Sequence, residues 1–258
     1  MSTTPSFCQE LTVLSCTGTQ DSSLVNLVLE NPGWTCRPGQ FVMLRPLDWG
    51  TELVWARPFS ICDISSHGLR IFFQVVGRGT ARLAQLTPGQ KVVVWGPLGQ
   101  SFVLDNERPN LLLAGGMGIA PFVFLAKSSP AHTSMLFGHR LPLQEYPAFQ
   151  EIATHIPSEA MQQCNHEDLI CFEETLHERI KALSGVGQVL ACGPEPMLRV
   201  VHKYCLQHGT DGQVSLENRM ACGVGACLGC VARTTQGDLV QSCVQGPVFD
   251  VRHLDWGA

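Results

Sequence analysis

The sequence has few charged residues, and among its 258 residues the basic side chains are outnumbered by the acidic ones, 17 to 22. With a net charge of −5 and no basic stripe, the chain lacks the positive surface that a nucleic-acid partner requires. Its first residues lack a basic start and an apolar core, so we expect no secretory signal and a cytoplasmic protein. The hydrophobic share of 45% is enough for a substantial core and excludes global disorder.

Long uninterrupted apolar runs are also absent. The longest apolar stretch, at 110–126, reads NLLLAGGMGIAPFVFLA and contains three glycines and a proline. A membrane-spanning helix needs about 20 consecutive apolar residues. We therefore interpret this stretch as a buried strand, a turn and a helix with Pro121 in its first turn, and we expect no membrane partner.

Cysteine, in contrast, is abundant, with 12 residues. Because no secretory signal is expected, we interpret these residues as reduced thiols and not as disulfides. Eight are scattered singly and are expected to be small buried apolar side chains: Cys8, Cys16, Cys36, Cys62, Cys164, Cys171, Cys192 and Cys205. The other four lie together near the C-terminal end of the sequence.

These four, Cys222, Cys227, Cys230 and Cys243, are spaced C-x4-C-x2-C-x12-C. This is the spacing of plant-type [2Fe–2S] clusters, whose loop must wrap a compact inorganic core and aim backbone N–H groups at the sulfides. Small residues between the ligands, in the run MACGVGACLGC, permit that approach. Structural zinc is the alternative, but it usually uses two C-x2-C knuckles, and here only Cys227 and Cys230 form one. The pattern favours the iron–sulfur cluster.

The rest of the chain predicts a β barrel plus an α/β domain. Up to about residue 104, short runs rich in Val, Ile and Phe alternate with Gly/Pro turns, which is typical of an antiparallel barrel or sandwich. From about residue 109, strands alternate with helices, as in GQVLACGP followed by EPMLRVVHKYCLQH, which is typical of a parallel sheet in a nucleotide-binding fold. We expect three domains: a barrel at 1–105, an α/β domain at 106–212 and a cysteine module at 213–258.

Two motifs in the predicted barrel have the chemistry of a flavin site. The run RPFS places the Arg57 cation and the Ser60 hydroxyl on one short strand, where they could pair with a phosphate and a flavin ring. About twenty residues later, Gly79 and Thr80 lie at the start of a short helix, where backbone N–H groups suit a pyrophosphate. Each motif alone is also common at ordinary strand ends and helix starts.

Two further motifs lie in the predicted α/β domain. The run LLLAGGMGIAP carries Gly115, Gly116 and Gly118 between a strand and a helix, as in a dinucleotide-binding turn, but it ends in G-x-G-x-x-P and departs from the standard fingerprint. The run ACGPEPM places Cys192 at the end of another parallel strand, where open α/β sheets bind their ligands. From its position alone, Cys192 could equally lie against a nicotinamide or be a buried thiol.

In their order along the chain, RPFS, GxGT, GGxGxxP, CGPxPM and the cysteine module resemble the ferredoxin–NADP reductase superfamily. The runs ENRMACGVGACLGC and CVQGPVF further resemble one family within it, the electron-transfer subunits of NAD-dependent dihydroorotate dehydrogenases. Glu217, Arg219 and the run at 246–249 match that family, whereas Asn218 stands where the family usually has serine. The resemblance covers nearly the whole chain.

This resemblance implies FAD, NAD and a [2Fe–2S] cluster as cofactors. It implies an FAD site made of Arg57, Pro58, Phe59, Ser60, Phe72, Phe73, Gln74, Gly79 and Thr80. It implies an NAD site, with Cys192 as the catalytic contact, made of Gly115, Gly116, Gly118, Cys192 and Gly193. It implies the cluster ligands Cys222, Cys227, Cys230 and Cys243. Arg140, in the run GHR, leaves the choice between NAD and NADP open because it could reach a 2′-phosphate.

The resemblance also implies a chain of electron carriers. An FMN-containing dihydroorotate dehydrogenase catalytic subunit, in a heterotetramer with this chain, would oxidise dihydroorotate in pyrimidine biosynthesis. Electrons would pass singly through the cluster to FAD, which would reduce NAD+. The same layout could serve as the NAD(P)H reductase subunit of a hydrogenase or sulfite reductase, or as a redox sensor whose flavin and nicotinamide sites are vestigial. The intact flavin and nicotinamide motifs count against the sensor.

Overall fold

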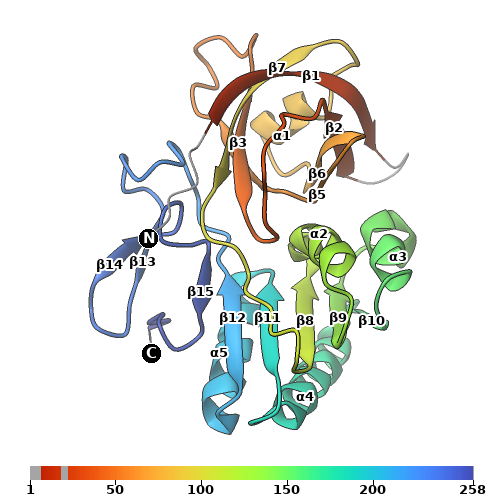
Figure 1. The fold of residues 1–258 in the computed structure, drawn as a ribbon, viewed down its shortest axis with the longest axis vertical. Coiled ribbons are helices and arrows are strands. Elements are labelled where there is room, and N and C mark those ends of the chain that lie inside the picture. Colours follow the sequence, from red (N-terminus) through yellow and green to blue (C-terminus); the bar gives the residue numbers. More distant parts are fainter. Residues whose placement is uncertain (1–6, 19–22, 258) are drawn as a thin grey trace.

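The N-terminal part of the chain forms a curled antiparallel sheet of seven strands, which confirms the predicted barrel (Figure 1). The computed structural model describes residues 7–18 and 23–257. The strand order is β4-β3-β7-β1-β2-β6-β5, and the short helix α1 lies between β6 and β7 in the chain. These elements are β1 (Phe7–Gly18), β2 (Leu24–Leu29), β3 (Phe41–Pro46), β4 (Arg57–Ser60), β5 (Asp63–Ser65), β6 (Gly68–Gln74), α1 (Arg78–Leu83) and β7 (Lys91–Leu98).

Alternation along the strands explains why this sheet curls around an apolar interior. In β2, Leu27 and Leu29 are buried, whereas Val28 between them and Asn26 before them are only partly buried. Successive side chains of a strand point to opposite faces, so one face of the sheet collects the aliphatic side chains. Leu27 and Leu29 join a core of side chains from all but one strand of the sheet.

The second half of the chain forms a six-stranded sheet in the order β10-β9-β8-β11-β12-β15, covered by helices (Figure 1). The first five strands are parallel, as predicted, and β15 pairs with β12 in the antiparallel direction. Its elements are β8 (Asn110–Gly115), α2 (Ala120–Ser128), β9 (Thr133–His139), α3 (Pro147–Ala153), β10 (Ser158–Gln162), α4 (His166–Ala182), β11 (Gln188–Cys192), α5 (Glu195–His208), β12 (Asp211–Ser215) and β15 (Val248–Asp250). In the described part of the chain, no helix combines the length and the hydrophobicity needed to cross a bilayer.

Both faces of this sheet are buried, which accounts for the continuous apolar run of β8. Leu112 and Ala114 pack in the same core as residues of α2 and α3. Leu111 and Leu113, which alternate with them, pack in a second core with residues of α4 and α5. A strand buried on both faces has no polar positions to alternate, so it reads as a hydrophobic run.

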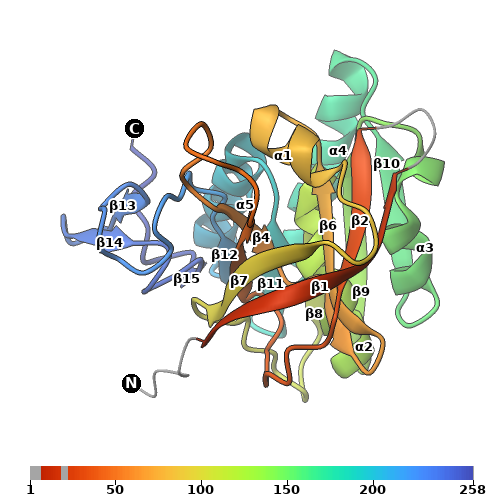
Figure 2. The same cartoon turned by 90° about the horizontal axis from the view of Figure 1, so that it is seen from above.

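The cysteine-rich segment is attached to the second sheet. Its hairpin consists of β13 (Val231–Arg233) and β14 (Leu239–Gln241), and both views place it on the side of the molecule away from α3 (Figures 1 and 2). After the hairpin, the chain returns to the parallel sheet as β15. The expected domain boundary between 212 and 213 falls inside β12, so strand pairing continues across it.

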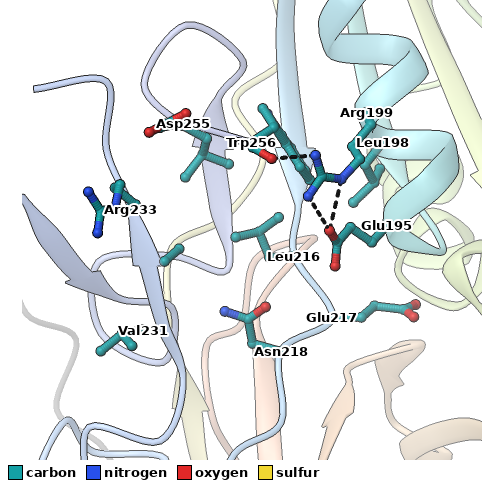
Figure 3. A pocket seen from close by; sticks show the side chains of 12 residues that line it. Glu195, Leu198, Arg199, Leu216, Glu217, Asn218, Val231, Arg233, Asp255 and Trp256 are labelled. Atoms are coloured by element: carbon teal, nitrogen blue, oxygen red, sulfur yellow. Dashed lines mark hydrogen bonds and ion pairs between the residues drawn. The ribbon is translucent and has the colours of Figure 1, made fainter. Parts of the chain in front are cut away.

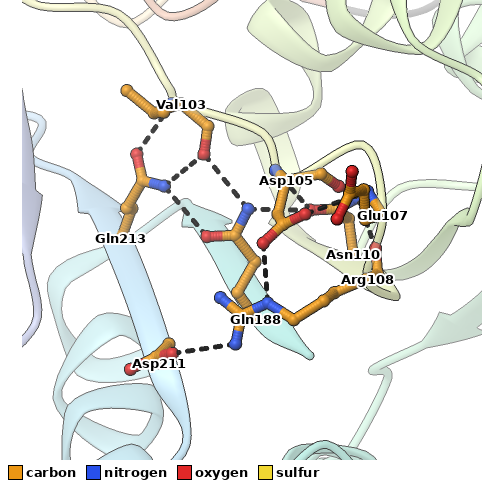
Figure 4. Close-up of polar contacts among 8 residues, drawn as sticks. All are labelled: Val103, Asp105, Glu107, Arg108, Asn110, Gln188, Asp211 and Gln213. Carbon is orange, nitrogen blue, oxygen red and sulfur yellow. Dashed lines mark hydrogen bonds and ion pairs between the residues drawn. The ribbon is translucent and has the colours of Figure 1, made fainter. Parts of the chain in front are cut away.

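A network of side-chain amides fixes the segment that links the two large sheets (Figure 4). Gln188 Nε2 donates to the Val103 carbonyl at 3.1 Å and to Asn110 Oδ1 at 2.8 Å. Gln213 contacts the same linker residue twice: its Nε2 donates to the Val103 carbonyl at 2.6 Å, and its Oε1 accepts from the Val103 N–H at 2.9 Å. Asn110 Nδ2 of β8 donates to the Asp105 carbonyl at 2.7 Å, so the linker is bonded to β8, β11 and β12 at once.

Asp211 joins the linker to the C-terminal segment. Arg108, in the linker, is 3.3 Å from Asp211 Oδ2 and 2.7 Å from Asp105 (Figure 4). Arg252, just after β15, is 2.8 Å from Asp211 Oδ1. One carboxylate at the start of β12 thus bridges cations from two distant parts of the chain.

A second ion network connects the barrel directly to the helices of the second domain. Arg70 of β6 is 2.7 Å from Glu151 of α3. Lys127 of α2 is 2.6 Å from Glu151 and 2.6 Å from Asp63 of β5. Burial acts to raise the pKa of Glu151, but hydrogen bonds and charges from Arg70 and Lys127 hold that pKa below its usual value.

Replacing Glu151 by glutamine tests the strength of this connection. We expect Glu151→Gln to lower the free energy of unfolding by about 1–2 kcal/mol at pH 7, measured by urea denaturation, because two partly buried charge-assisted contacts are lost. A group whose pKa is depressed by folding stabilises the protein above its unfolded pKa and loses this effect on protonation. The difference between wild type and variant should therefore shrink as the pH falls below about 4.3.

The matched control is Glu159→Gln, which removes the more exposed ion pair with Arg179 and should cost less than about 0.5 kcal/mol. Equal effects of the two substitutions, or a Glu151→Gln deficit that does not shrink between pH 7 and pH 3, would contradict the proposed contribution of Glu151.

Candidate cofactor cleft and metal centre

A cleft of about 980 Å³ runs between the barrel and the carboxyl ends of the parallel strands. The strand order reverses between β8 and β11, and open α/β sheets bind ligands at such a switch point. Most of the predicted FAD and NAD residues line this cleft: Arg57, Pro58, Phe59, Ser60, Phe72, Phe73, Gln74, Thr80, Gly115, Gly116 and Cys192. Gly79, Gly118 and Gly193 do not line it. The roles of all these residues stay predictions.

On the barrel wall, the groups that contact Arg57 do not neutralise its charge. Its Nη1 donates to the Trp55 carbonyl at 2.6 Å, and its guanidinium carbon lies 5.4 Å from the centre of the Trp49 ring. Within residues 7–18 and 23–257 it has no carboxylate partner. A guanidinium that is fixed but not neutralised is suited to a phosphate.

The start of α1 lies against Arg57, although about twenty residues separate them in the sequence. A Cβ added at Gly79 would come within 2.6 Å of Arg57 Nε, so this backbone passes directly over the guanidinium. The Thr80 hydroxyl is already engaged, because it accepts hydrogen bonds from the N–H groups of Val76 and Gly77. Thr80 therefore stabilises the turn before α1. Arg57 beside it has no carboxylate partner among the described residues.

On the opposite wall, glycines allow the turn after β8 to contact the end of β11. A Cβ at Gly118 would lie 2.0 Å from the Cys192 carbonyl oxygen, closer than any side-chain atom can approach. A Cβ at Gly193 would lie 3.0 Å from the Gly115 Cα. Gly118 and Gly193 thus allow the turn and the end of β11 to pack closely. Gly115 and Gly116 line the cleft on the other side of this contact.

At the carboxyl ends of β11 and β12, three side chains meet in the cleft. The Cys192 thiol is buried, and burial, together with the charge of Glu217, raises its pKa despite a hydrogen bond with Ser215. Glu217 keeps contact with solvent, yet the surrounding protein desolvates its carboxyl and raises its pKa. Cys192 is therefore a neutral thiol, suited to contact a ligand ring and not to act as a thiolate.

Sequence reasoning did not find Ser215, and it noted Glu217 only as a matched position. Both residues lie at or just beyond the end of β12, beside the end of β11 that carries Cys192. The carboxyl ends of parallel strands gather at one edge, so a strand predicted directly after the helix that ends at His208 would have pointed to both residues.

The four clustered cysteines lie as two pairs. Cys222 is within hydrogen-bond reach of Cys227, and Cys230 is within reach of Cys243. In the described residues, no group of three or more His, Cys, Asp or Glu side chains lies close enough together to hold a metal ion. Two pairs suit a two-iron cluster, in which four thiolates are shared between two metal ions.

Backbone N–H groups point at these sulfurs. Val224 N–H donates to Cys222 Sγ at 3.4 Å, and Gly225 N–H donates to Cys243 Sγ at 3.2 Å. Burial acts to raise the pKa of Cys222, but donors from Val224, Cys227 and Ala226 lower it to about 7. The donor set and its N–H groups fit a negatively charged cluster of sulfur and iron.

The two pairs differ in their exposure. Cys230 and Cys243 are 3% and 2% exposed, whereas Cys227 is at the surface. The buried pair packs with Phe41, Met43 and Leu98 of the barrel strands β3 and β7. The site therefore has one side at the solvent, where Cys227 lies. Its other side packs against the barrel, where Cys230 and Cys243 lie.

A smaller pocket of about 270 Å³ lies between α5, the residues after β12 and the hairpin strand β13 (Figure 3). Arg199 of α5 pairs with Glu195 at 2.8 Å, donates to the Trp256 carbonyl and lies 5.8 Å from the Trp256 ring centre. The segment around Trp256 thereby ties the cysteine module to α5. Sequence reasoning did not predict this contact.

Comparison with protein families gives a match for the C-terminal segment. Residues 217–255 match the model described as the iron–sulfur cluster binding domain of dihydroorotate dehydrogenase B. The segment includes all four paired cysteines.

Curated relatives match most of the chain. The dihydroorotate dehydrogenase B (NAD(+)) electron transfer subunit of Clostridium acetobutylicum is 32% identical over 219 residues, which cover 83% of this chain and 84% of that protein. The protein of the same name from Fusobacterium nucleatum is 33% identical over 234 residues, which cover 83% and 85%.

Solved structures share the fold at lower identity. An NADH-dependent reduced ferredoxin–NADP oxidoreductase aligns with a TM-score of 0.81 at 22% identity and covers 95% of this chain and 90% of that one. A ferredoxin–NADP+ reductase from Neisseria gonorrhoeae, solved with FAD and NADP, aligns with a TM-score of 0.61 at 16% identity and covers 78% and 92%. These likenesses show the ferredoxin–NADP reductase fold.

Two glycine substitutions in the turn after β8 distinguish the cost of a steric clash from the cost of an unfavourable backbone conformation. Gly118→Ala should lower the free energy of unfolding by about 2–3 kcal/mol, measured by urea denaturation, because its Cβ meets the Cys192 carbonyl. Gly116→Ala should cost only about 1 kcal/mol, because Gly116 has a φ of +52° but open space around it. Equal costs would contradict the contact between the turn and β11.

Proposed function

This chain belongs to the family of electron transfer subunits of dihydroorotate dehydrogenase B (NAD(+)), and we propose that it passes electrons from a dihydroorotate-oxidising subunit to NAD+. The carriers proposed within the chain are a [2Fe–2S] cluster and FAD. When bound, the cluster exchanges one electron at a time, and the flavin converts between one-electron steps and the hydride of NADH.

We assign the cluster to Cys222, Cys227, Cys230 and Cys243. The support is the arrangement of the four thiols in two pairs, with backbone N–H groups directed at their sulfurs. The match of residues 217–255 to an iron–sulfur cluster binding domain supports the same assignment. The protein's part is to hold four thiolates and to neutralise their charge with N–H dipoles.

We assign FAD to the barrel wall of the cleft and the dinucleotide to the opposite wall. Arg57 would neutralise a phosphate group, and Phe59 and Phe73, whose ring centres are 5.1 Å apart, would line the flavin side. Gly115 and Gly116 would face the dinucleotide, with Cys192 against the nicotinamide as a neutral contact.

One observation carries the proposal. Phe41 of β3 lines the cleft, and it also belongs to the apolar cluster that contains the buried Cys230 and Cys243. Met220 likewise lines the cleft and packs on that cluster. The same packed side chains therefore border both the cleft and the inner pair of thiols, which supports electron exchange over a short distance between the two proposed sites.

The outer face of the cysteine module supports a partner subunit. Val224, Leu228 and Val244 are 53%, 58% and 45% exposed and lie in or beside the ligand loop, which also exposes Cys227. Exposed apolar side chains that gather at one place mark an interaction surface. We propose that a catalytic subunit containing FMN covers this face and that the complex is a heterotetramer.

Arg57→Ala tests the flavin assignment. It removes a charge-assisted contact worth roughly 1.5–3 kcal/mol, so the affinity for FAD should fall about ten- to a hundredfold in a flavin titration of the apoprotein. Arg82→Ala, an exposed arginine on α1, is the matched control and should leave FAD affinity unchanged. Full FAD retention by Arg57→Ala would mean that the flavin lies elsewhere.

The function is tested by reconstitution with the catalytic subunit. The isolated chain should reduce artificial acceptors with NADH but should not oxidise dihydroorotate, because we assign that oxidation to the FMN-containing catalytic subunit. Adding the FMN-containing subunit should create NAD+-linked dihydroorotate oxidation. Cys227→Ser should abolish this gain and the visible cluster absorption, yet preserve flavin reduction by NADH.

Cys171→Ser is the matched control, because Cys171 is exposed on α4 and far in sequence from the cluster ligands. This variant should behave as wild type in every assay. Oxidation of dihydroorotate by the isolated chain, or full coupling by Cys227→Ser, would refute the electron-transfer role.

A further inference from the structure

The residues that follow β12 border the cleft and then lead into the ligand loop. Leu216, Glu217 and Asn218 line both the cleft and the smaller pocket beside α5. Met220 lines the cleft and packs on the apolar cluster that contains the inner cysteines. Cys222, the first of the four paired cysteines, follows directly after this segment. The segment therefore belongs to the cleft and to the cysteine module at once.

The Asn218 amide bonds to the inner cysteine pair. Its Nδ2 donates to the Cys230 carbonyl at 3.2 Å and to the Ser242 hydroxyl oxygen at 2.9 Å. Ser242 is buried and directly precedes Cys243, and its own N–H donates to the same Cys230 carbonyl at 2.9 Å. These hydrogen bonds form a closed set that fixes the backbone at Cys230 to the backbone beside Cys243.

Asn218 is the link between the cleft wall and these cysteines. Among the described residues that line the cleft, it alone donates a side-chain hydrogen bond to one of the four paired cysteines. Its amide lies on the side of Val231 of the hairpin, whereas the carboxylate of the neighbouring Glu217 lies on the side of Glu195 (Figure 3). The amide is therefore directed from the cleft wall toward the cysteine module.

A side chain in this position has a known kind of effect. Residues that bond to the ligands of a metal site, and not to the metal, orient those ligands, and substituting them typically costs about 10- to 100-fold in metal affinity or activity. Asn218 bonds to Cys230 directly and reaches Cys243 through Ser242. In a chain of redox cofactors, the protein's own contribution is to bind and orient each carrier. Asn218 lines one proposed carrier site and holds the ligands of the other.

We propose that Asn218 is the positioning residue between the two carriers: its amide fixes the Cys230 and Cys243 side of the cluster beside the cleft, and electrons cross on this side. The inference rests on the proposed function, because it takes the cluster and the flavin to occupy the sites assigned to them. It deepens that function by naming the residue that connects these sites and the pair of cysteines that faces the flavin. The outer pair, with the exposed Cys227, then faces the partner subunit.

The test uses the complete chain loaded with flavin and cluster, and it needs no catalytic subunit. Rapid mixing with NADH should give two absorbance phases. In the first, the hydride of NADH reduces the flavin and NAD+ is formed. In the second, one of the two electrons passes to the cluster and the other stays on the flavin. Asn218→Ala should leave the rate of the first phase unchanged and slow the second about ten- to a hundredfold.

Cluster content and spectroscopy distinguish this role from a merely structural one. Asn218→Ala should retain about two irons and two sulfides per chain, because all four cysteines remain. The electron paramagnetic resonance spectrum of its chemically reduced cluster should differ from that of wild type, because the Cys230 carbonyl has lost a hydrogen bond. Chemical reduction does not pass through the flavin, so this spectrum reports on the cluster alone.

Further variants examine the hydrogen bonds themselves. Asn218→Leu keeps roughly the same volume but offers no donor, so it should behave as Asn218→Ala. Ser242→Ala leaves the bond between Asn218 and Cys230 in place and should slow the second phase less. Combining Asn218→Ala with Ser242→Ala should slow it no further than Asn218→Ala alone, because both residues belong to one network.

The matched control is Gln245→Ala. Gln245 lies two residues after Cys243, and its Oε1 accepts from the Gln241 N–H at 2.6 Å. It does not line the cleft, and in the described part of the chain its side chain bonds to no paired cysteine. This variant should match wild type in both phases and in the spectrum of the reduced cluster.

The possible failures are distinguishable. A second phase of normal rate in Asn218→Ala, or equal slowing of both phases, refutes the role of Asn218 and leaves the proposed electron-transfer function standing. If the wild-type chain shows no cluster phase after flavin reduction, the proposed function is wrong and the inference falls with it. If Asn218→Ala loses its iron, Ser242→Ala decides, because a normal second phase in that variant refutes the inference.

Discussion

The burial of Cys230 and Cys243 against β3 and β7 is the contact on which the arrangement of the molecule depends. Thiols that pack among Phe41, Met43 and Leu98 cannot move away from the barrel without exposing apolar surface. Trp95 of β7 adds a hydrogen bond from its Nε1 to the Cys222 carbonyl at 3.3 Å. The cysteine module is therefore positioned by the barrel, although in sequence it follows the parallel-sheet domain.

The same constraint explains the different surroundings of the two cysteine pairs. The inner pair lies among hydrophobic side chains, and the outer pair lies at a surface that includes Leu228, whose φ of +55° is unusual for a residue with a side chain. A non-glycine residue in this conformation costs about 1–2 kcal/mol, so the surrounding loop must hold it there. The loop around Leu228 thus keeps this conformation at some cost in local stability.

Features set by local chemistry could be predicted from the sequence. The spacing of the cysteines indicated one site, Pro121 indicated the first turn of α2, and the glycine-rich turn indicated where β8 ends. Long-range pairings could not be predicted. β15 is only three residues long, too short to show a period, and the amides of Gln188 and Gln213 acquire partners only when the linker is folded against them. Ser215 lies in no recognisable motif, and only the pairing of β12 with β11 places it beside Cys192.

The two walls of the cleft are fastened to each other at two separate places. Val103 ties the linker to β11 and β12, and Glu151 ties α3 to the barrel strand β6. Both attachments oppose a hinge motion that would widen the cleft by separating the barrel from the second domain. A flavin bound between two walls that stay together would be retained through many catalytic cycles, as a resident group and not as a substrate.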